Sequence, residues 1–568
     1  MNKDEKKDIN IKKNDELIIE IHDIGQQGEG IGKYKGYTLF VNNSTLGDKV
    51  KVKVMKTKKN YGFARLTEII EASPFRVNPK CKIADKCGGC SIQHINYEKQ
   101  LEIKQNRVTS CLERIAGFDL SYVEVAPIIG MEDPYYYRNK VQLPVGKNKE
   151  GKIVMGFYAK RTHSIINMET CYIQSDINND IFKIVGEFLQ RNNISIYNEK
   201  THKGLVRHII TRVGFTTGEV MVCLVINGKK LGKQEELIKE LTKISGMTSI
   251  CLNYNLENTN VIMGEKVKTI WGRDYITDYI GDIKYQISPT SFYQVNPIQT
   301  KVIYEKALEF ADLTGKETVW DLYCGIGTIS LFMAGKAKQV YGVEIVEDAI
   351  LDARRNAKLN NIDNAEFFIG AAEEILPGKY KEDSIHADVI VVDPPRKGCD
   401  ESLLDTIVEI KPEKVVYVSC DPATLARDLK YLAGKGYELK KVQAIDQFPH
   451  TVHVETVVSL SHKKADSHIH VNIEFGEGDG KIPVDKIAQK AEEYRPSERV
   501  TYKMIQEYIE SKYDFKVHTA YIAEVKRSLG LPMYDAPNAV EELKHERKHP
   551  TPEKVEAIKD ALKHFKVI

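Results

Sequence analysis

The sequence lacks any long apolar segment. No apolar run among the 568 residues approaches the ~20 residues that a membrane-spanning helix needs. The first residues, MNKDEKKDINIKKNDE, are charged and contain no apolar signal core. There is no internal repeat, which argues against an array of repeated units. These absences exclude membrane-spanning and exported classes, and we expect a cytoplasmic protein.

The sequence also has little net charge. Its 82 Lys and Arg residues nearly balance 80 Asp and Glu residues, which leaves +2. Any nucleic-acid binding must therefore come from local basic patches and not from the global charge. A hydrophobic share of 42% and a charged share of 29% are typical of a globular protein. The length predicts about three or four domains.

Ten cysteines are present. A disulfide framework is not expected in a cytosolic chain, so clustered cysteines indicate metal, and isolated ones indicate packing or catalysis. One cluster is present: Cys81, Cys87 and Cys90. A fourth ligand must come from elsewhere, and Cys171 is the candidate. The spacing alone allows zinc or a [4Fe–4S] cluster equally. We expect the following cysteines to be packing residues: Cys111, Cys223, Cys251, Cys324 and Cys399.

Residues 14–73 alternate short β-rich runs with glycines. This pattern predicts a five-stranded barrel of the OB type. Basic side chains cluster in its second half, with Tyr61 and Phe63 between them: Lys49, Lys51, Lys53, Lys56, Lys58, Lys59 and Arg65. Basic residues interleaved with aromatics suit RNA phosphates and base stacking. The alternative is an edge strand that lysines protect from aggregation.

Three further regions follow. Residues 74–290 read as a Cys-rich connector and a central α+β domain, with a helix at Tyr97–Ile115. Residues 291–462 alternate strands and helices, which predicts a doubly wound, Rossmann-like α/β domain. Residues 463–568 read as a small α/β extension with a strand at His470–Phe475. Its two helices, Thr501–Lys512 and Thr519–Leu529, fit either a helix-turn-helix module or a plain helical appendage.

A glycine-rich turn in the α/β domain predicts a cofactor site. The motif DLYCGIGT, Asp321–Thr328, follows one predicted strand, and Glu344 ends the next. An acidic residue there can accept hydrogen bonds from ribose hydroxyls. These features also fit a dinucleotide oxidoreductase. The turn lacks that fingerprint's third glycine, which favours S-adenosylmethionine.

A second turn follows the next predicted strand at Asp393-Pro394-Pro395-Arg396. Two prolines fix the backbone there and expose the aspartate at the edge where α/β sheets bind ligands. Such a turn resembles the target-binding loop of amino- and base-methylating enzymes. A plain strand-ending turn is the alternative.

Cys420 ends another apolar run, and Glu455 follows within PHTVHVE, Pro449–Glu455. Uracil C5 is too weak a nucleophile to take a methyl group directly, whereas a thiolate that adds to C6 activates it. A base must then remove the C5 proton. Cys420 and Glu455 can supply these groups, and the following helix N-terminus is expected to lower the pKa of the thiol. The alternatives are an inert buried thiol and an outward-facing carboxylate.

The target base must be splayed or flipped out of RNA structure to reach a thiol. We expect His450 and His453 to orient Glu455. The segment Tyr135–Lys140 is either an RNA contact or a structural strand, and the residues favour neither.

Five motifs together resemble those of the bacterial RNA uracil-C5-methyltransferases, over residues 14–462. The likeness is greatest to the iron–sulfur branch that acts on 23S ribosomal RNA. The motifs are FYQVN at Phe292–Asn296, DLYCGIGT at Asp321–Thr328, DPPRKG at Asp393–Gly398, SCDP at Ser419–Pro422 and PHTVHVE at Pro449–Glu455. The resemblance implies that the barrel is a TRAM domain and that the enzyme makes 5-methyluridine as a monomer.

The resemblance also implies residue roles. Cys420 would be the nucleophile and Glu455 the proton acceptor. Contacts to S-adenosylmethionine would come from Gln294, Tyr323, Thr328, Glu344 and Asp393. A structural [4Fe–4S] cluster would be held by Cys81, Cys87, Cys90 and Cys171. The sequence departs from the pattern at Thr328 and Ala371, where relatives carry asparagine, and Ala371 is therefore given no cofactor role.

Three other functions remain open at this point. The same chemistry could act on tRNA. A non-catalytic RNA-binding protein or chaperone could retain the fold, although the joint presence of Cys420 and Glu455 disfavours it. An NAD-type oxidoreductase with an iron–sulfur centre is disfavoured by the missing glycine and by the SCDP motif.

Overall fold

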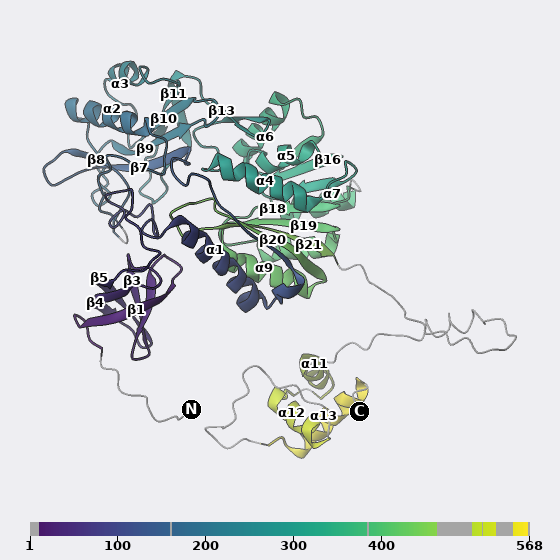
Figure 1. The fold of residues 1–568 in the computed structure, drawn as a ribbon. Coiled ribbons are helices and arrows are strands. Elements are labelled where there is room, and N and C mark those ends of the chain that lie inside the picture. Colours follow the sequence, from purple (N-terminus) through teal and green to yellow (C-terminus); the bar gives the residue numbers. More distant parts are fainter. Residues whose placement is uncertain are drawn as a thin grey trace, which may run out of the picture. The chain divides into compact units, whose positions relative to one another are not determined.

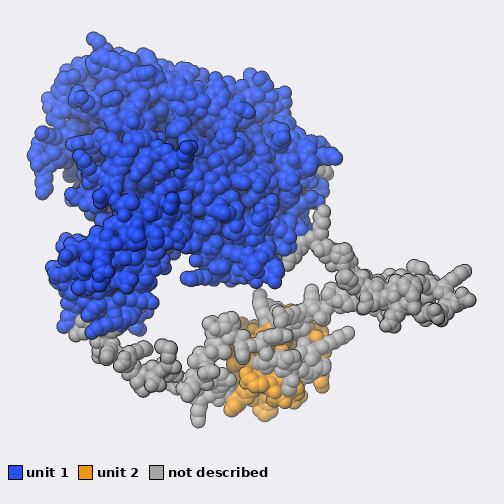
Figure 2. Space-filling model, in the orientation of Figure 1, with its two compact units in different colours: residues 1–467 blue, residues 468–568 orange. Residues whose placement is uncertain are grey.

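The computed structural model describes residues 11–159, 162–382, 385–462, 502–513, 515–529 and 549–565. The chain divides into two compact units, residues 1–467 and 468–568 (Figure 2). In these described ranges, no helix is long and apolar enough to cross a membrane.

The first strands close into a barrel in the order β1-β2-β3-β5-β4 (Figure 1). They are β1 (Glu16–Ile24), β2 (Gly30–Tyr34), β3 (Tyr37–Asn42), β4 (Lys49–Thr57) and β5 (Tyr61–Glu71). Alternate residues of β4 point inward, because successive side chains of a strand face opposite sides. Val50, Val52 and Val54 are fully buried, and the lysines between them lie on the outer surface. The predicted five-stranded barrel is confirmed.

A six-stranded sheet follows in the order β12-β11-β10-β9-β7-β8. Its strands are β7 (Lys140–Lys147), β8 (Ile153–Met155), β9 (Val206–Val213), β10 (Val220–Ile226), β11 (Met247–Tyr254) and β12 (Lys266–Gly272). The helices α2 (Ile177–Arg191) and α3 (Gln234–Leu241) pack on it through one apolar core. A separate hairpin joins β13 (Ile276–Ile280) to β14 (Ile283–Ile287).

The largest sheet has eight strands in the order β17-β16-β15-β18-β19-β21-β20-β6. They are β6 (Glu124–Ile129), β15 (Thr318–Asp321), β16 (Gln339–Glu344), β17 (Ala365–Ile369), β18 (Val389–Val392), β19 (Lys414–Ser419), β20 (Tyr437–Ile445) and β21 (Glu455–His462). Neighbouring strands run parallel except for β21, which is antiparallel to both β19 and β20.

Helices cover both faces of this sheet, as the doubly wound pattern predicts. One core holds residues of α4 (Pro297–Ala311), α5 (Thr328–Ala334) and α6 (Glu347–Leu359). The other holds residues of α1 (Tyr97–Cys111), α7 (Ala372–Glu382), α8 (Glu401–Ile410) and α9 (Pro422–Gly434). A π-helical turn, Leu112–Ala116, extends α1, and a short 3₁₀ turn spans Leu120–Tyr122.

The N-terminal helix α1 and strand β6 belong to this same sheet structure. Strand β6 pairs with β20, and α1 packs on α9. The predicted division at residue 291 did not foresee this arrangement, because a single edge strand carries no signal of the sheet it joins. Residues 97–129 therefore join the large sheet, although the central sheet follows them in the chain. After the central sheet, the chain returns to the large sheet with β15.

The second unit contains three described helices: α11 (Tyr502–Tyr513), α12 (Thr519–Ser528) and α13 (Pro552–His564). They pack around apolar residues that include Ile505, Ile522 and Ile558. The first two match the predicted helices, and α13 was not predicted. The strand expected at His470–Phe475 lies outside the described residues.

Candidate active site

The carboxyl ends of parallel strands bring three sequence-predicted site residues, together with Asp321, to one edge of the large sheet. Asp321 ends β15 and Glu344 ends β16, whereas Asp393 and Cys420 directly follow β18 and β19. The strand order reverses between β15 and β18, and α/β sheets bind their ligands at such a point. The predicted cofactor and target halves therefore meet at this edge.

Glu455 reaches the same edge for a different reason. It is the first residue of β21, and β21 runs opposite to its neighbours, so its start lies beside their ends. Thr456 pairs with Ser419, which makes Glu455 and Cys420 neighbours one residue beyond that pair. Glu455 is only 3% exposed, and Cys420 is partly exposed. The structure therefore brings the two predicted catalytic residues together.

The Cys420 thiol is held neutral in the free protein. Burial, followed by the nearby Glu455 and Asp393 carboxyls, raises its pKa to about 12. The expected lowering by the helix N-terminus is wrong. The carboxylate of Asp421 caps α9 and accepts hydrogen bonds from the N–H groups of Ala423 and Thr424, at 2.9 and 3.3 Å. A negative group thus occupies the helix terminus that was expected to stabilise the thiolate.

The neighbouring carboxyls also favour their protonated forms. Burial raises the pKa of Glu455 well above its usual range, and Asp393 adds to the effect. Burial and Asp321 raise the pKa of Asp393 to about 7. Arg396 is the opposing cation, since it lowers the pKa of both Cys420 and Glu455. Arg396 belongs to the DPPRKG motif, but the sequence predicted no role for it.

The glycine-rich turn has the backbone that a closely bound ligand requires. Gly325 and Gly327 have φ values of 53° and 80°, which favour glycine. A Cβ on Gly327 would also lie 3.1 Å from the Phe367 ring. The N–H of Gly325 donates to the Glu344 carboxylate at 3.3 Å. The turn and the acidic residue predicted for ribose binding are therefore in contact.

Three other predicted cofactor residues lie around this turn. Thr328 begins α5, and its hydroxyl accepts a hydrogen bond from Tyr304 at 2.9 Å. Tyr323 is half-buried, and burial raises its pKa. The main-chain carbonyl of Gln294 accepts a hydrogen bond from the Asn139 side chain at 2.9 Å. Sequence reasoning missed Ile345, which is 72% exposed beside Glu344 and can offer an apolar surface to an adenine ring.

The segment Tyr135–Lys140 supports the site from within. Tyr137 is fully buried, and its hydroxyl donates to the carbonyl of Pro449 at 3.1 Å. Asn139 is 5% exposed and bonds the FYQVN segment through its backbone and its side chain. Burial lowers the pKa of Lys140 to about 7, with help from Arg212 and Arg138. Of the two interpretations left open, the structural one fits Tyr137 and Asn139.

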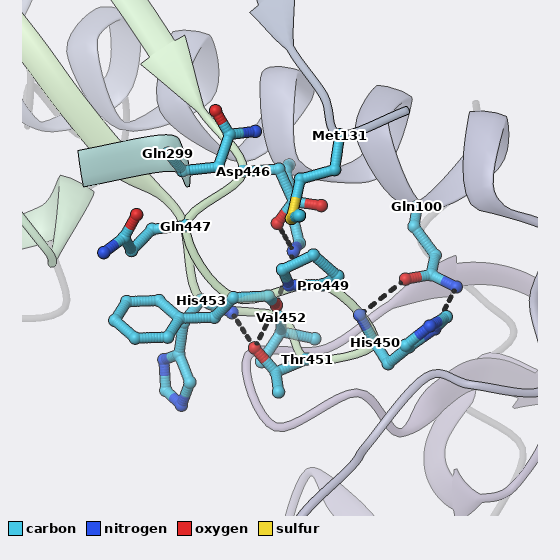
Figure 3. Close-up of polar contacts among 12 residues, drawn as sticks. Gln100, Met131, Gln299, Asp446, Gln447, Pro449, His450, Thr451, Val452 and His453 are labelled. Atoms are coloured by element: carbon cyan, nitrogen blue, oxygen red, sulfur yellow. Dashed lines mark hydrogen bonds and ion pairs between the residues drawn. The ribbon is translucent and has the colours of Figure 1, made fainter. Parts of the chain in front are cut away.

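The PHTVHVE segment forms the loop between β20 and Glu455 (Figure 3). His450 is buried, and its ring faces Gln100, with 3.3 Å between Nδ1 and Nε2. Burial and Lys104 lower the pKa of His450 to about 4. Burial and Arg396 lower that of His453 to about 4. Both rings are therefore neutral at pH 7, and the partner of the His450 ring is Gln100.

The four cysteines of the predicted metal site line one small cavity of about 20 Å³: Cys81, Cys87, Cys90 and Cys171. Burial raises the pKa of Cys171 to about 11, and burial followed by the other three thiols raises the pKa of Cys90. No group of three or more potential ligands in the described part of the chain converges as around a metal ion. The sequence thus selected four cysteines that do meet in space, without the close convergence of a single-ion site.

A groove of about 1060 Å³ lies between the barrel and helix α1 and reaches the residues after Cys420. Three barrel rings line it, with neighbouring centroids 5.7 Å apart: Phe40, Tyr61 and Phe63. Arg107 and Arg114 line it from α1, and Asp421 lies beside the nucleophile candidate. Part of the predicted basic patch is neutralised, since Lys49 pairs with Glu71 and Lys51 pairs with Glu16.

Comparisons with known proteins agree with this site. Residues 96–463 match the family described as tRNA (Uracil-5-)-methyltransferase, and residues 12–67 match the TRAM domain. An uncharacterized RNA methyltransferase of Clostridium tetani is 52% identical over 458 residues, which cover 80% of this chain and 98% of that protein. One from Bacillus cereus is 50% identical over 452 residues, with coverage of 79% and 97%.

A solved structure shares the fold. The tRNA (uracil-54, C5)-methyltransferase of Pyrococcus abyssi, in complex with S-adenosyl-L-homocysteine, is 30% identical with a TM-score of 0.63. The match covers 78% of this chain and all of that one. The barrel is therefore a TRAM domain, and the large α/β sheet is the methyltransferase fold. The chain belongs to the tRNA (uracil-5-)-methyltransferase family and is an S-adenosylmethionine-dependent RNA uracil-C5-methyltransferase.

Proposed function

We propose that this enzyme methylates C5 of a uridine in 23S ribosomal RNA through a covalent bond between Cys420 and C6 of the base. The observation that carries the covalent mechanism is the adjacency of Cys420, just after the end of β19, and Glu455, at the start of the paired strand β21. A thiol and a buried carboxyl side by side, at the ligand-binding edge of a methyltransferase sheet, provide a nucleophile and a base for one ring.

The reaction then proceeds in balanced steps. The Cys420 thiol loses its proton to solvent, Sγ bonds to C6, and the C5=C6 electron pair moves onto the C4 carbonyl. The C4 carbonyl re-forms as C5 bonds to the methyl group that S-adenosylmethionine supplies, and the sulfur–methyl bond electrons leave with S-adenosylhomocysteine. The Glu455 carboxylate accepts the C5 proton. The electron pair of that C–H bond re-forms C5=C6, and the Sγ–C6 bond breaks to return the thiolate.

The raised pKa values set the order of these protonation changes. A thiolate forms more easily beside a protonated Glu455, because two adjacent buried anions repel. Once sulfur is bonded to carbon it no longer carries that charge, and Glu455 can then ionise and act as a base. Arg396 stabilises both anions in turn. In the free protein, the Cys420 thiol and the Glu455 carboxyl are therefore both neutral.

Five residues support cofactor binding in this proposal: Gln294, Tyr323, Thr328, Glu344 and Asp393. The positive φ values at Gly325 and Gly327 allow the ligand to approach the protein backbone closely. The Glu344 carboxylate can accept hydrogen bonds from ribose hydroxyls, and the exposed Ile345 side chain can contact the adenine ring. Asp393 lies between the cofactor turn and Cys420, where the methyl group must pass.

The RNA strand beside the target uridine is proposed to lie in the groove between barrel and α1. Stacking of a base on Tyr61 or Phe63 would be worth about 1–3 kcal/mol. Arg107 and Arg114 offer charge to the phosphates. Asp421, the residue after Cys420, lines the groove, so a strand bound there could deliver a flipped base to the thiol. Such an enzyme would act in the cytoplasm, and we propose that it does so as a monomer.

Four thiols line one cavity, and thiolates can hold either zinc or a [4Fe–4S] cluster. The resemblance to the iron–sulfur branch favours the cluster over zinc. Cys81, Cys87, Cys90 and Cys171 would hold it, and its role would be structural.

A tRNA target is the second candidate, because the matched family and the Pyrococcus abyssi relative are described as acting on tRNA. The cysteine site favours ribosomal RNA through the resemblance to the iron–sulfur branch. The test incubates the enzyme with labelled S-adenosylmethionine and unmodified ribosomal RNA or tRNA, and then maps the labelled nucleoside. We expect 5-methyluridine in 23S rRNA, and labelling confined to tRNA would overturn the proposed target.

A further inference from the structure

The loop that leads to Glu455 is fastened along its length by other elements. Asp446 forms a buried ion pair with Lys104 of α1 and accepts a hydrogen bond from Tyr97 at 2.8 Å. The carbonyl of Gln447 accepts from Asn296 at 3.0 Å. Two residues later the chain enters the PHTVHVE segment that ends at Glu455. The position of Glu455 therefore depends on what holds this loop.

The Cys-rich connector contacts the loop directly. The N–H groups of Ser91 and Ile92 both donate to the carbonyl of His450, at 3.0 and 3.1 Å. The Ser91 hydroxyl accepts from the N–H of Val452 at 3.2 Å. Ser91 immediately follows Cys90, one of the four cysteines around the cavity. The connector thus fastens the loop three residues before Glu455.

Helix α1 fastens the same point from another side. The N–H of His450 donates to Oε1 of Gln100 at 3.0 Å, while Nε2 of Gln100 meets the His450 ring (Figure 3). His450 has a φ of 65°, a conformation that a non-glycine residue holds only when its surroundings impose it. Gln100 is 1% exposed, so no solvent can replace these bonds.

The cysteine cavity and the loop also share their packing. Cys90 and Cys171 pack against a small core that contains Tyr137, with Tyr97 at its edge. Tyr137 donates to the carbonyl of Pro449, and Tyr97 bonds Asp446. The Tyr135 ring stacks on His450 with centroids 4.5 Å apart. Tyr137 and Tyr97, which border the cysteines on this side, therefore also hold the loop.

We propose that the connector after Cys90, together with Gln100, positions Glu455 for removal of the C5 proton, with Ser91 and Gln100 as positioning residues. The inference rests on the proposed covalent mechanism. Cys420 follows β19 and precedes α9, where Asp421 fixes the backbone through Ser419 and the helix N-terminus. Loosening the loop therefore displaces the base more than the nucleophile, and it slows the step that breaks the C5–H bond.

The experiment compares Gln100→Leu and Ser91→Ala with the wild type in single turnovers, on RNA tritiated at uracil C5. Methyl transfer to RNA and tritium release to water are followed separately. We expect tritium release to slow about ten-fold, methyl transfer to change by less than about two-fold, and the protein–RNA adduct to accumulate. The matched control is Gln443→Leu. Gln443 is buried at 3% exposure on β20 and donates to the carbonyl of Pro127 instead of the loop.

Equal slowing of methyl transfer and tritium release, or wild-type behaviour in both variants, would overturn the inference. So would adduct accumulation in Gln443→Leu, which would show a general effect of lost stability. Ser91→Ala removes one hydroxyl and decides the matter if Gln100→Leu does not fold. Failure of the proposed function looks different: the wild type would release no tritium, and Glu455→Gln would trap no adduct.

Discussion

The two cysteine sites of this protein both contain buried thiols with raised pKa values, but the groups around these thiols differ. Burial raises the pKa of Cys420 to about 12 and that of Cys171 to about 11, so both thiols are neutral in the free protein. Around Cys171 the neighbours are three more thiols, which only a metal centre can deprotonate together. Around Cys420 the neighbours are two carboxyls and an arginine. A carboxyl can exchange a proton with a bound base, and the arginine stabilises the anion.

The difference shows why one site is proposed as structural and the other as catalytic. A cluster of equivalent thiols has no group that could accept a proton from a substrate. The Cys420 site has a thiol after β19, a buried carboxyl at the start of β21 and the Arg396 cation in the loop after β18, at the edge where ligands bind. Substitutions at the two sites should therefore have different consequences.

Replacing the nucleophile should have the largest effect. Cys420→Ala is expected to lower methylation by at least about 1,000-fold, because no covalent activation of C5 remains. S-adenosylmethionine affinity, measured by calorimetry, should stay within a few-fold. Cys111→Ala is the matched control, since Cys111 is also a half-buried thiol that lines the groove. Substantial turnover by Cys420→Ala would remove the assignment.

Removing the base should stop the reaction one stage later. Glu455→Gln keeps the shape of the side chain but cannot accept the C5 proton, so turnover should fall about 100- to 10,000-fold. The protein–RNA adduct should accumulate and migrate as a shifted band on a denaturing gel. An inactive variant without that band would place Glu455 elsewhere in the reaction.

The cysteine site should respond in stability and colour. Cys171→Ser is expected to lower the thermal midpoint of anaerobically purified protein and to abolish its visible absorbance, because metal binding contributes to folding. Cys111→Ser should change neither. A colourless wild type with stoichiometric zinc would contradict the iron–sulfur proposal while leaving the Cys420 chemistry intact.

Alkylation of Cys420 in the free enzyme should depend steeply on pH. With a pKa of about 12, the thiolate fraction and the iodoacetamide rate should rise about ten-fold per pH unit between pH 7 and 10. Arg396→Ala removes the cation that lowers this pKa, so it should slow alkylation at every pH. Fast, pH-independent alkylation above pH 7 would mean that the thiol is already ionised.

The smallest effect concerns acid stability. The folded pKa of His450 lies near 4, below its usual 6.5. Its contribution is therefore complete above pH 6.5 and is lost as the pH falls through 4, by about 3 kcal/mol at most. His450→Asn, which tolerates the positive φ, should flatten the fall of the thermal midpoint between pH 6.5 and 4. An unchanged slope would show that His450 does not titrate there.

Most of the site edge could be predicted from sequence because it obeys local rules. Strand ends carry the motifs, so Asp321, Glu344, Asp393 and Cys420 could be located from the pattern of predicted strands. The antiparallel direction of β21, which brings Glu455 to Cys420, is a property of strand pairing that no local pattern contains.

Long-range contacts account for what could not be predicted. The bond from Ser91 to Val452 spans 361 residues in sequence, and that from Gln100 to His450 spans 350. The thiol pKa was predicted in the wrong direction, because the helix N-terminus is occupied by Asp421, a cap that the SCDP motif itself contains. The charge of a cap must therefore be weighed against the helix dipole.

The most direct test of the central claim is a mass spectrum of the adduct that Glu455→Gln forms with RNA and S-adenosylmethionine. After digestion by protease and nuclease, we expect one cross-linked peptide, containing Cys420 joined to a uridine that carries one added methyl group. A cross-link at any other cysteine, or full turnover by Glu455→Gln without an adduct, would contradict the account.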